Sequence, residues 1–242
     1  MVWLAIIATV CFAVFFIRVI RHEANLAAAV HGMAAVPDMQ EGAVTWPNYE
    51  AYDSEMRGIN PDYVGLLIID GTAISYPVVR GSDNVKYLST TYAGIENPFG
   101  GLFMDYRCTG ENRPHIIIYG HNIMDVYGNS HYFGGLDAFL EEGFMAEHPV
   151  ITLVEGGFVS EFEIFSARLT DTGDPAYHLN FNAPGSFDSF LERNGAPPDA
   201  QQILTLSTCY GAGVDEMRVI IQGMRRSIIP IDGGQVVIGI NK

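Results

Sequence analysis

Residues 202–218 have the sequence QILTLSTCYGAGVDEMR, and the fold can be worked outward from this stretch. Its first half is an apolar run interspersed with Thr and Ser, which predicts a buried strand, and the glycines after it predict a turn. Cys209 then lies at a strand end, where a thiol is held firmly yet stays accessible, whereas most lone cysteines fill the core. If the β-type run that follows pairs with this strand as a hairpin, Arg218 falls beside Cys209. A positive charge there would favour the thiolate and stabilise an oxyanion; the alternative is a weak surface salt bridge from Arg218 to Asp215 or Glu216.

After Pro61 the chain consists of short β-type runs separated by turn residues, which predicts a mainly β domain, either a barrel or a sandwich. Asp70 and Gly71 predict a tight turn between the first two strands. Helical spacing predicts one helix before this domain, at 49–59, and two further helices interrupt the strands, at 131–140 and 187–193. The predicted strands are 64–69, 74–79, 102–106, 115–119, 150–154, 158–169, 202–209 and 217–224, with one more short strand at 235–240.

A second informative stretch is residues 115–122, HIIIYGHN. The isoleucines predict a buried strand, and Gly120 turns the chain so that His121 is presented at the strand end. A barrel brings strand ends from distant parts of the sequence to one rim, so His121 and Cys209 can meet in space. Taken alone, a histidine in a turn is more often a surface polar residue than a catalytic one. His115 begins the same strand and is expected at the opposite rim.

Composition narrows the class of protein. At 242 residues the chain can bury one good core, and its net charge of −15, with lysine only at Lys86 and Lys242, argues against a nucleic-acid partner. An acidic surface in water is the simplest interpretation of that charge. The three cysteines, Cys11, Cys108 and Cys209, form neither a disulfide framework nor a paired zinc-binding motif, so no metal or cofactor is expected.

The N-terminal residues are strongly apolar. Residues 2–17 carry no charge, which predicts a membrane anchor over 1–22, with a cleaved signal peptide as the alternative. Arg18 and Arg21 follow the apolar run, and positive charges there favour keeping the residues after the run in the cytoplasm. A basic leader upstream of Met1 would resolve this conflict with an extracellular domain. The expected organisation is an anchor at 1–22, a helical linker with N-terminal helices at 23–60, and a β domain at 61–242.

Several of these stretches together resemble one known family. The chain looks like a sortase, and most closely a class B sortase, the membrane-anchored cysteine transpeptidases of Gram-positive bacteria. The resemblance covers most of the chain after Asn60, and TLSTC and YGHN with a downstream Arg are highly specific in combination. The matching text is INPDYVGLLII at 59–69, YPVVRGSDNVKYL at 76–88, GLFMDYR at 101–107, IIIYGHN at 116–122, FEIFSA at 162–167, ILTLSTC at 203–209 and then Arg218.

The resemblance implies a closed sortase-type β-barrel of about eight strands. The barrel would have N-terminal helices and a helix in the connection between the sixth and seventh strands, which fits the helix predicted at 187–193. It also implies roles for three residues. Cys209 would attack the Thr carbonyl of a C-terminal sorting signal, His121 would protonate the departing amine, and Arg218 would stabilise the oxyanion and position the peptide.

The resemblance also implies substrate-binding residues, in less detail than the three catalytic roles. Ser207 and Thr208 precede the nucleophile and resemble groove-lining positions, and Tyr177 matches a position that contacts substrate. Ser89 stands where some class B members carry Asn after the YL pair, and we expect it in the substrate groove. Tyr210 stands where the residue after the nucleophile is often acidic. Both departures touch the region expected to bind the signal peptide.

The family implies partners and a location. These are surface proteins bearing a C-terminal sorting signal, and an amine of the peptidoglycan cross-bridge or its lipid-linked precursor, with a pilin lysine as an alternative. The expected location is the cell membrane, single-pass, with the catalytic domain extracellular. Two other interpretations stay open: a catalytically silent β-barrel binding module on the surface, and a hydrolytic cysteine peptidase of another fold. The tail at 230–242 is longer than the family barrel needs.

Overall fold

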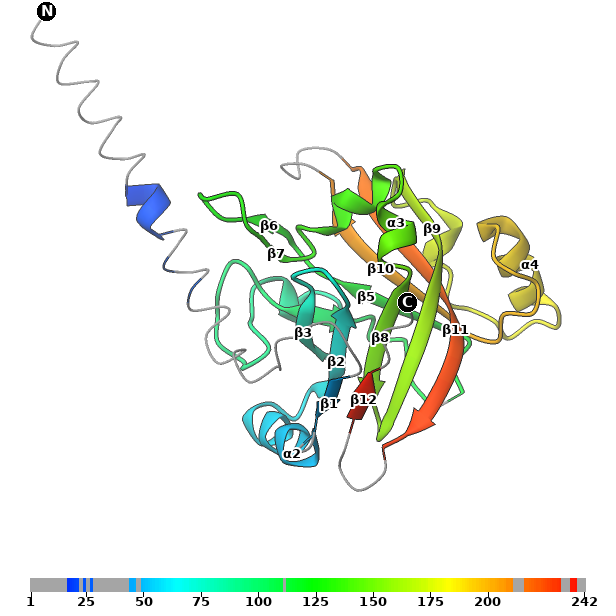
Figure 1. Ribbon diagram of the computed structural model, residues 1–242, viewed down its shortest axis with the longest axis horizontal. Helices are drawn as coiled ribbons and strands as arrows, with labels where there is room; N and C mark the ends of the chain where they lie inside the picture. The colour runs from blue at the N-terminus through cyan, green and yellow to red at the C-terminus, as the bar shows by residue number, and fades with distance from the viewer. Residues whose placement is uncertain are drawn as a thin grey trace, which may run out of the picture.

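The structure is a computed structural model that describes residues 17–21, 24, 27, 44–46, 49–110, 112–210, 216–231 and 236–238. Within these residues, eight strands close into one barrel in the order β10-β11-β9-β8-β2-β3-β4-β5 (Figure 1). Neighbours are antiparallel except for β3 with β4 and β5 with β10, which are parallel. The strands are β2 (Tyr63–Ile69), β3 (Ser75–Val79), β4 (Leu102–Met104), β5 (His115–Tyr119), β8 (Val150–Glu155), β9 (Phe158–Thr170), β10 (Ile203–Cys209) and β11 (Arg218–Pro230).

This barrel confirms the predicted fold class. Each of the eight strands predicted between residues 64 and 224 is present, with ends that shift by a few residues. The predicted helix at 187–193 is α4 (Ser186–Asn194), which lies between β9 and β10 as expected. The helix predicted at 49–59 is α2 (Tyr49–Ile59).

Alternate residues of each strand fill the barrel interior, because successive side chains on a strand point to opposite faces. On β10, Leu204 and Leu206 belong to this apolar interior, as do Ile116 and Ile118 on β5. The residues between them therefore point outward. Much of the outer face is also buried, which explains why these strands show a weak alternation in sequence.

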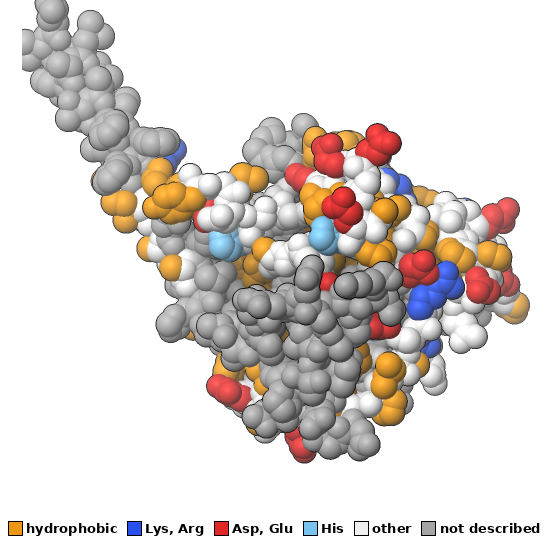
Figure 2. All heavy atoms as spheres, viewed as in Figure 1, with side chains coloured by type: hydrophobic (Ala, Val, Ile, Leu, Met, Phe, Trp, Pro, Cys, Tyr) orange, Lys and Arg blue, Asp and Glu red, His pale blue; other side chains and the backbone are white. Residues whose placement is uncertain are grey.

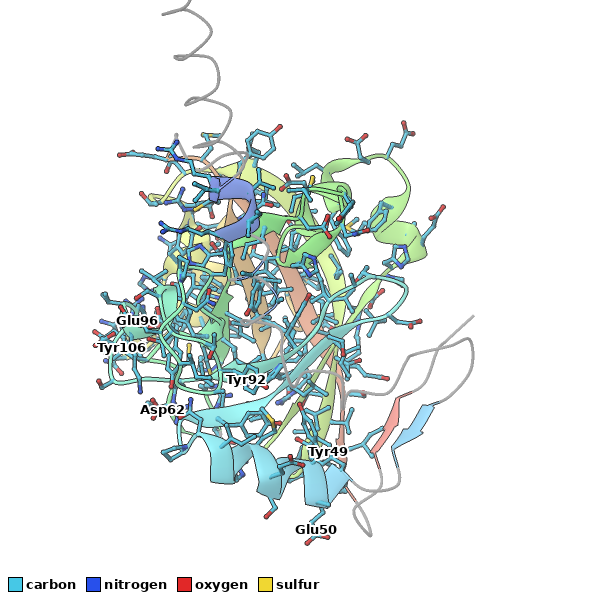
Figure 3. The ribbon with its side chains drawn as sticks, turned by 90° about the vertical axis from the view of Figure 1, so that its left-hand side faces the viewer. Tyr49, Glu50, Asp62, Tyr92, Glu96 and Tyr106 are labelled. Carbon is cyan, nitrogen blue, oxygen red and sulfur yellow. The ribbon has the colours of Figure 1, made fainter. Side chains whose placement is uncertain are left out.

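Helices and loops cover the outer face. The helix α2 packs against β2, burying Tyr49, Tyr52 and Met56 in a second apolar cluster with Tyr63. Figure 3 shows Tyr49 pointing towards the barrel while Glu50 points into solvent. The helix α4 covers another part of the outer face with Phe190 and Leu191.

The prediction of a helix at 131–140 is wrong for the first half of this range. That part of the chain forms a two-stranded hairpin, β6 (Asn122–Met124) with β7 (Ser130–Tyr132), and only a 3₁₀ helix, η3 (Leu136–Leu140), follows. The backbone of Tyr132 has a positive φ of 51°, and two glycines follow it, which interrupts a helix. The remaining elements are the 3₁₀ helices η2 (Lys86–Leu88) and η4 (Pro175–Tyr177) and the short helix α3 (Phe144–Glu147).

The tail forms a strand near the predicted position. The strand β12 (Val236–Ile238) pairs antiparallel with β1 (Val44–Trp46), a strand that was not predicted. The sheet joins two segments at opposite ends of the sequence.

The molecular surface is acidic without one dominant patch on the face shown in Figure 2, where Asp and Glu side chains are spread over several elements.

The expected location needs correction. Of the predicted anchor at 1–22, residues 1–16 and 22 lie outside the described residues, and most of the linker predicted before residue 44 does too. No helix that the structure describes is both long and apolar enough to cross a membrane. This finding contradicts the expectation of a single-pass protein of the cell membrane.

Candidate active site

The hairpin predicted around the cysteine is present. The strands β10 and β11 are antiparallel neighbours, and their register places Cys209 directly opposite Arg218. The pair lies at the end of the hairpin, where the backbone N–H of Tyr210 donates to the carbonyl of Met217 at 3.1 Å. Cys209 is half-buried, so its thiol is held by the sheet and stays accessible. The loop residues 211–215, which include Asp215, lie outside the described residues.

The histidine lies just beyond the neighbouring strand. The chain leaves β5 through Gly120, whose N–H donates to the carbonyl of Ser207 at 3.2 Å, and His121 follows. Any other residue would crowd the core at this position, because a Cβ on residue 120 would come within 2.3 Å of Leu102 Cδ2 and 2.9 Å of Phe133 Cδ2. The imidazole Nε2 of His121 donates to the carbonyl of Leu88 at 2.9 Å. A carbonyl can only accept, so this bond places the proton on Nε2 and leaves Nδ1 for other partners.

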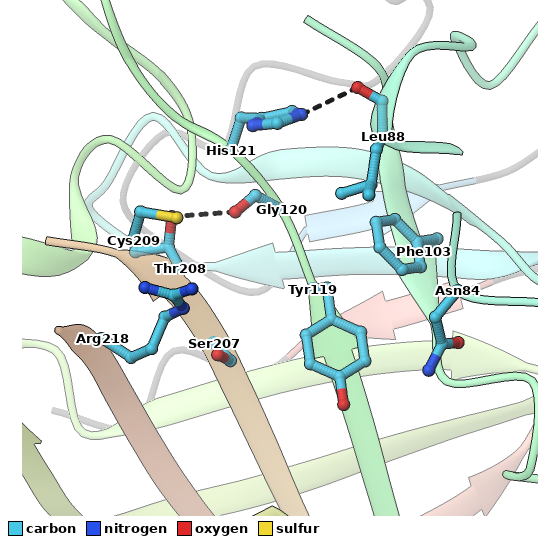
Figure 4. A pocket seen from close by; sticks show the side chains of 10 residues that line it. All are labelled: Asn84, Leu88, Phe103, Tyr119, Gly120, His121, Ser207, Thr208, Cys209 and Arg218. Carbon is cyan, nitrogen blue, oxygen red and sulfur yellow. Dashed lines mark hydrogen bonds between the residues drawn. The ribbon is translucent and has the colours of Figure 1, made fainter. Parts of the chain in front are cut away.

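One cavity of about 210 Å³ brings these residues together (Figure 4). His121, Cys209 and Arg218 all line it, as do Ser207 and Thr208. The cavity lies on the outer face of the barrel: Leu206 points inward, so Ser207 and Cys209 point outward beside Tyr119, the register partner of Ser207. The complete set of lining residues is Asn84, Leu88, Phe103, Tyr119, Gly120, His121, Ser207, Thr208, Cys209 and Arg218.

Two side-chain hydrogen bonds fix the histidine segment to the cysteine strand. Thr208 Oγ1 donates to the carbonyl of Gly120 at 2.8 Å, and Asn122 Nδ2 donates to the carbonyl of Cys209 at 3.0 Å. Asn122 Nδ2 also faces the carboxylate of Asp137 at 3.3 and 3.4 Å. Burial raises the pKa of Asp137, although the bond from Asn122 opposes the effect. Neither Asn122 nor Asp137 was predicted from the sequence, and the position of Asn122 next to His121 is the signal that could have identified it.

The predicted substrate residues divide into three groups. Ser207 and Thr208 line the cavity, as stated. Tyr177 does not line it, but its hydroxyl lies 2.8 Å from Ser207 Oγ, so it supports a lining side chain. Burial raises the pKa of the Tyr177 phenol. Ser89 does not line the cavity; it is exposed and ends the 3₁₀ helix η2, and its neighbour Leu88 takes the lining position.

Other lining residues were not predicted. Asn84 comes from the loop after β3, Leu88 from the 3₁₀ helix η2, Phe103 from β4 and Tyr119 from β5. The rings of Phe103 and Tyr119 lie 5.3 Å apart between centroids, and together they form an apolar wall. Among the described residues, no group of three His, Cys, Asp or Glu side chains is arranged to hold a metal ion.

The other histidine of the stretch at 115–122, His115, is buried away from the cavity. His115 begins β5, at the opposite end of the strand from the cavity, and is 1% exposed. Its Nδ1 lies 2.8 Å from the carbonyl of His178, and its Nε2 lies 2.8 Å from Thr205 Oγ1. Burial lowers the pKa of His115 to about 4, so it is neutral near pH 7. The expectation that it lies at the other rim is confirmed.

Comparisons with known proteins identify the family. No protein-family model matches the chain. Sortase B of Listeria monocytogenes is 31% identical over 197 residues, which cover 76% of this chain and 78% of that protein. Sortase B of Staphylococcus aureus is 28% identical over 187 residues, which cover 72% of each.

Solved structures agree with the sequence matches. Sortase B of Clostridium perfringens has a TM-score of 0.64 at 26% identity, covering 72% of this chain and 100% of that one. A Staphylococcus aureus sortase B–substrate complex has a TM-score of 0.62 at 27% identity, and the match covers 74% of this chain and 85% of that one. A sortase B complexed with triglycine has a TM-score of 0.64 at 26% identity, and the match covers 77% of this chain and 89% of that one. The barrel, the placement of a cysteine at its outer face and the extent of the match to the Listeria protein lead to one conclusion: this chain belongs to the class B sortases, a family of cysteine transpeptidases.

Proposed function

We propose that this chain cleaves a C-terminal sorting signal after Thr and transfers the protein through a thioester on Cys209 to an amine of a cell-wall precursor. The observation that carries the proposal is the register of the β10–β11 hairpin, which sets Cys209 opposite Arg218 in the cavity that His121 also lines. Nucleophile, acid and oxyanion partner are the three functions that acyl transfer through a cysteine requires.

The first half-reaction uses all three side chains. As the sulfur of Cys209 attacks the Thr carbonyl carbon, its proton passes to Nδ1 of His121. A C–S bond forms, and the guanidinium of Arg218 stabilises the resulting oxyanion. Collapse of this intermediate breaks the C–N bond. His121, held through Nε2 on the carbonyl of Leu88, gives the proton on Nδ1 to the departing amine. The enzyme is left with a thioester at Cys209 and a neutral imidazole.

The second half-reaction reverses these roles. An acceptor amine attacks the thioester carbon and a C–N bond forms. The C–S bond then breaks, and His121 takes up the proton that the amine loses and returns it to the departing sulfur. The product is an amide in place of a free acid. The solved relatives with a bound substrate and with bound triglycine support a sorting peptide as donor and a glycine amine as acceptor.

The test is direct detection of the thioester. The full chain is incubated with a library of short Pro- and Thr-containing peptides, and Cys209 is examined by mass spectrometry. We expect one peptide class to leave an acyl adduct on Cys209 and, after addition of triglycine, to yield the peptide–triglycine amide.

Two variants make the assignment specific. Cys209→Ala removes the nucleophile and should abolish the adduct, whereas Cys108→Ala changes only a buried thiol and should retain it. No adduct from any peptide, with the protein shown to be folded, would refute the proposal in favour of a silent binding module. Release of free acid alone, even with abundant triglycine, would indicate a hydrolytic peptidase.

A further inference from the structure

A buried carboxylate lies immediately behind the cavity wall. Asp105 follows β4 and is 0% exposed, yet it keeps the main-chain pairing of the barrel, because its N–H donates to the carbonyl of Ile117 at 2.9 Å. A buried carboxylate is costly unless several donors satisfy it. Asp105 has five such donors from three residues, and none of the three is adjacent to it in sequence.

Arg107 supplies the charge partner. The backbone N–H and Nε of Arg107 donate to Asp105 Oδ1 at 3.0 and 2.9 Å, and its Nη2 donates to Oδ2 at 2.8 Å. Burial alone would raise the pKa of Asp105, but the hydrogen bonds from Arg107 and Asn84 outweigh it and lower the pKa. Asp105 is therefore an anion near pH 7, and its hydrogen bonds are of the strong, charge-assisted kind.

The remaining two donors line the cavity. Asn84 Nδ2 donates to Asp105 Oδ2 at 2.8 Å, and the hydroxyl of Tyr119 donates to the same oxygen at 3.0 Å. Asn84 is fixed at its other end too, because its Oδ1 accepts from the N–H of Tyr106 at 3.0 Å. Figure 4 shows the polar ends of Asn84 and Tyr119 on one side of the cavity, away from His121.

We propose that Asp105 is a positioning residue for peptide recognition, which holds Asn84 and Tyr119 in the orientation that forms the wall of the cavity facing away from His121. This inference rests on the proposed function, because it assigns that wall to the sorting peptide. Asp105 does not contact the cavity itself, so its effect passes through the two side chains that it orients.

The catalytic histidine is anchored independently of Asp105. His121 is held by the carbonyl of Leu88, at the end of η2, and η2 is fixed by Tyr87, which is 0% exposed. The Tyr87 hydroxyl donates to Asp62 Oδ2 at 2.8 Å and accepts from Asn60 Nδ2 at 2.9 Å. Loss of the Asp105 carboxylate should therefore disturb peptide binding more than the chemical step.

The central variant is Asp105→Asn, which keeps the shape of the side chain. An amide has a single oxygen, so it can accept on only one of the two sides that the carboxylate serves. We expect KM for the peptide that acylates wild type best to rise about tenfold while kcat changes less than about threefold. The rate at which iodoacetamide alkylates Cys209 should stay within about twofold of wild type, since that small reagent needs no peptide wall.

A matched control removes a carboxylate charge elsewhere. Glu155 pairs with Arg113 near the start of β5, at the opposite end of this strand from Tyr119, and both side chains are largely buried. Glu155→Gln should leave KM unchanged. The double variant Asp105→Asn/Tyr119→Phe should have nearly the same KM as Asp105→Asn alone, because the two changes break the same hydrogen bond.

One readout needs no substrate. In ¹H–¹⁵N spectra the side-chain amide protons of Asn84 should exchange slowly in wild type and in Glu155→Gln, and rapidly in Asp105→Asn. Persistent protection in Asp105→Asn would overturn the positioning role even if no peptide acylates Cys209. With a reactive peptide, an unchanged KM, or an equal loss of acylation and alkylation in a folded variant, would also overturn it.

Discussion

The glycine before the histidine offers the sharpest test of how the barrel core controls the active site. Gly120 points into the barrel, and a methyl group there would come within 2.3 Å of Leu102 Cδ2 and 2.9 Å of Phe133 Cδ2. Both neighbours are fully buried. Gly120→Ala therefore forces one of them, or the backbone of residue 120, to move by about an ångström, because unstrained carbon contacts begin near 3.5 Å.

The magnitude follows from overpacking and from the position of the backbone. Inserting one methyl group into a close-packed core costs about 1–3 kcal/mol of stability. The backbone of Gly120 also bonds Ser207 and Thr208 of β10, and His121 follows directly. A displacement of about 1 Å at catalytic groups can cost about 100-fold in rate, so we expect Gly120→Ala to lower kcat by at least about tenfold.

The assay combines a stability measurement with acylation kinetics. Urea midpoints give the loss in stability, and the rate of Cys209 acylation gives the catalytic effect. Gly135→Ala is the matched control, because a Cβ there meets nothing closer than Ser130 Cβ at 3.8 Å and the φ of Gly135 is an ordinary −85°. That variant should match wild type within about 0.5 kcal/mol.

A second substitution separates overpacking from other causes. Leu102→Ala alone should cost about 2–5 kcal/mol, because it leaves a cavity in the barrel. The double variant with Gly120→Ala should be less destabilised than the sum of the single changes by about 1 kcal/mol, since the new methyl group partly fills that cavity. Unchanged stability and acylation in Gly120→Ala, or strict additivity in the double variant, would refute the reasoning.

Three further predictions concern other groups. Between pH 6.5 and pH 4 the unfolded chain binds a proton that neutral His115 does not, so wild type should lose up to about 3 kcal/mol of stability as the pH falls through this window, and His115→Gln should flatten the dependence of urea midpoints on pH. Tyr177→Phe removes a hydrogen-bond partner of Ser207 and should lower kcat/KM by about three- to tenfold in steady-state peptide kinetics; an unchanged value would contradict that support. Burial raises the pKa of the Cys108 thiol to about 11, so iodoacetamide at pH 8 should label Cys209 and leave Cys108 unlabelled in the folded protein by peptide mass mapping, and equal labelling of these two would contradict the buried placement of Cys108.

Local sequence patterns were sufficient for the barrel strands and for the position of Cys209 at a strand end, whereas closure of the strands into a barrel was implied only by the family resemblance. Apolar runs bounded by turn residues marked all eight barrel strands, and the short turn after Cys209 made the β10–β11 hairpin, with Arg218 opposite the thiol, the simplest pairing. The β6–β7 hairpin was missed, because strands of three residues are too short to show alternation. Its loop does carry turn residues, Gly128 and Asn129, which could have indicated it.

The far side of the cavity could not be predicted in the same way. The parallel pairing of β3 with β4 brings Asn84 and Asp105 together, and that of β5 with β10 places Tyr119 beside Ser207. Nothing local in the sequence specifies these pairings. The direction of the Cys209 side chain was not predicted. Thr205 on the outward face of β10 and Leu206 on the inward face are both fully buried, so burial does not distinguish the two faces of this strand.

The alternation of each strand couples the core of this barrel to its chemistry. Leu206 packs inside the barrel while Ser207 lines the cavity outside it, and Gly120 points inward between Tyr119 and His121, which both line the cavity. A change of packing inside the barrel therefore moves the backbone of the next residue on the outside. Recognition groups such as Asn84 lie on a loop and can vary without altering the core. For this reason substitutions in the interior should act on the rate of acylation, and substitutions on the loops should act on which peptide is accepted.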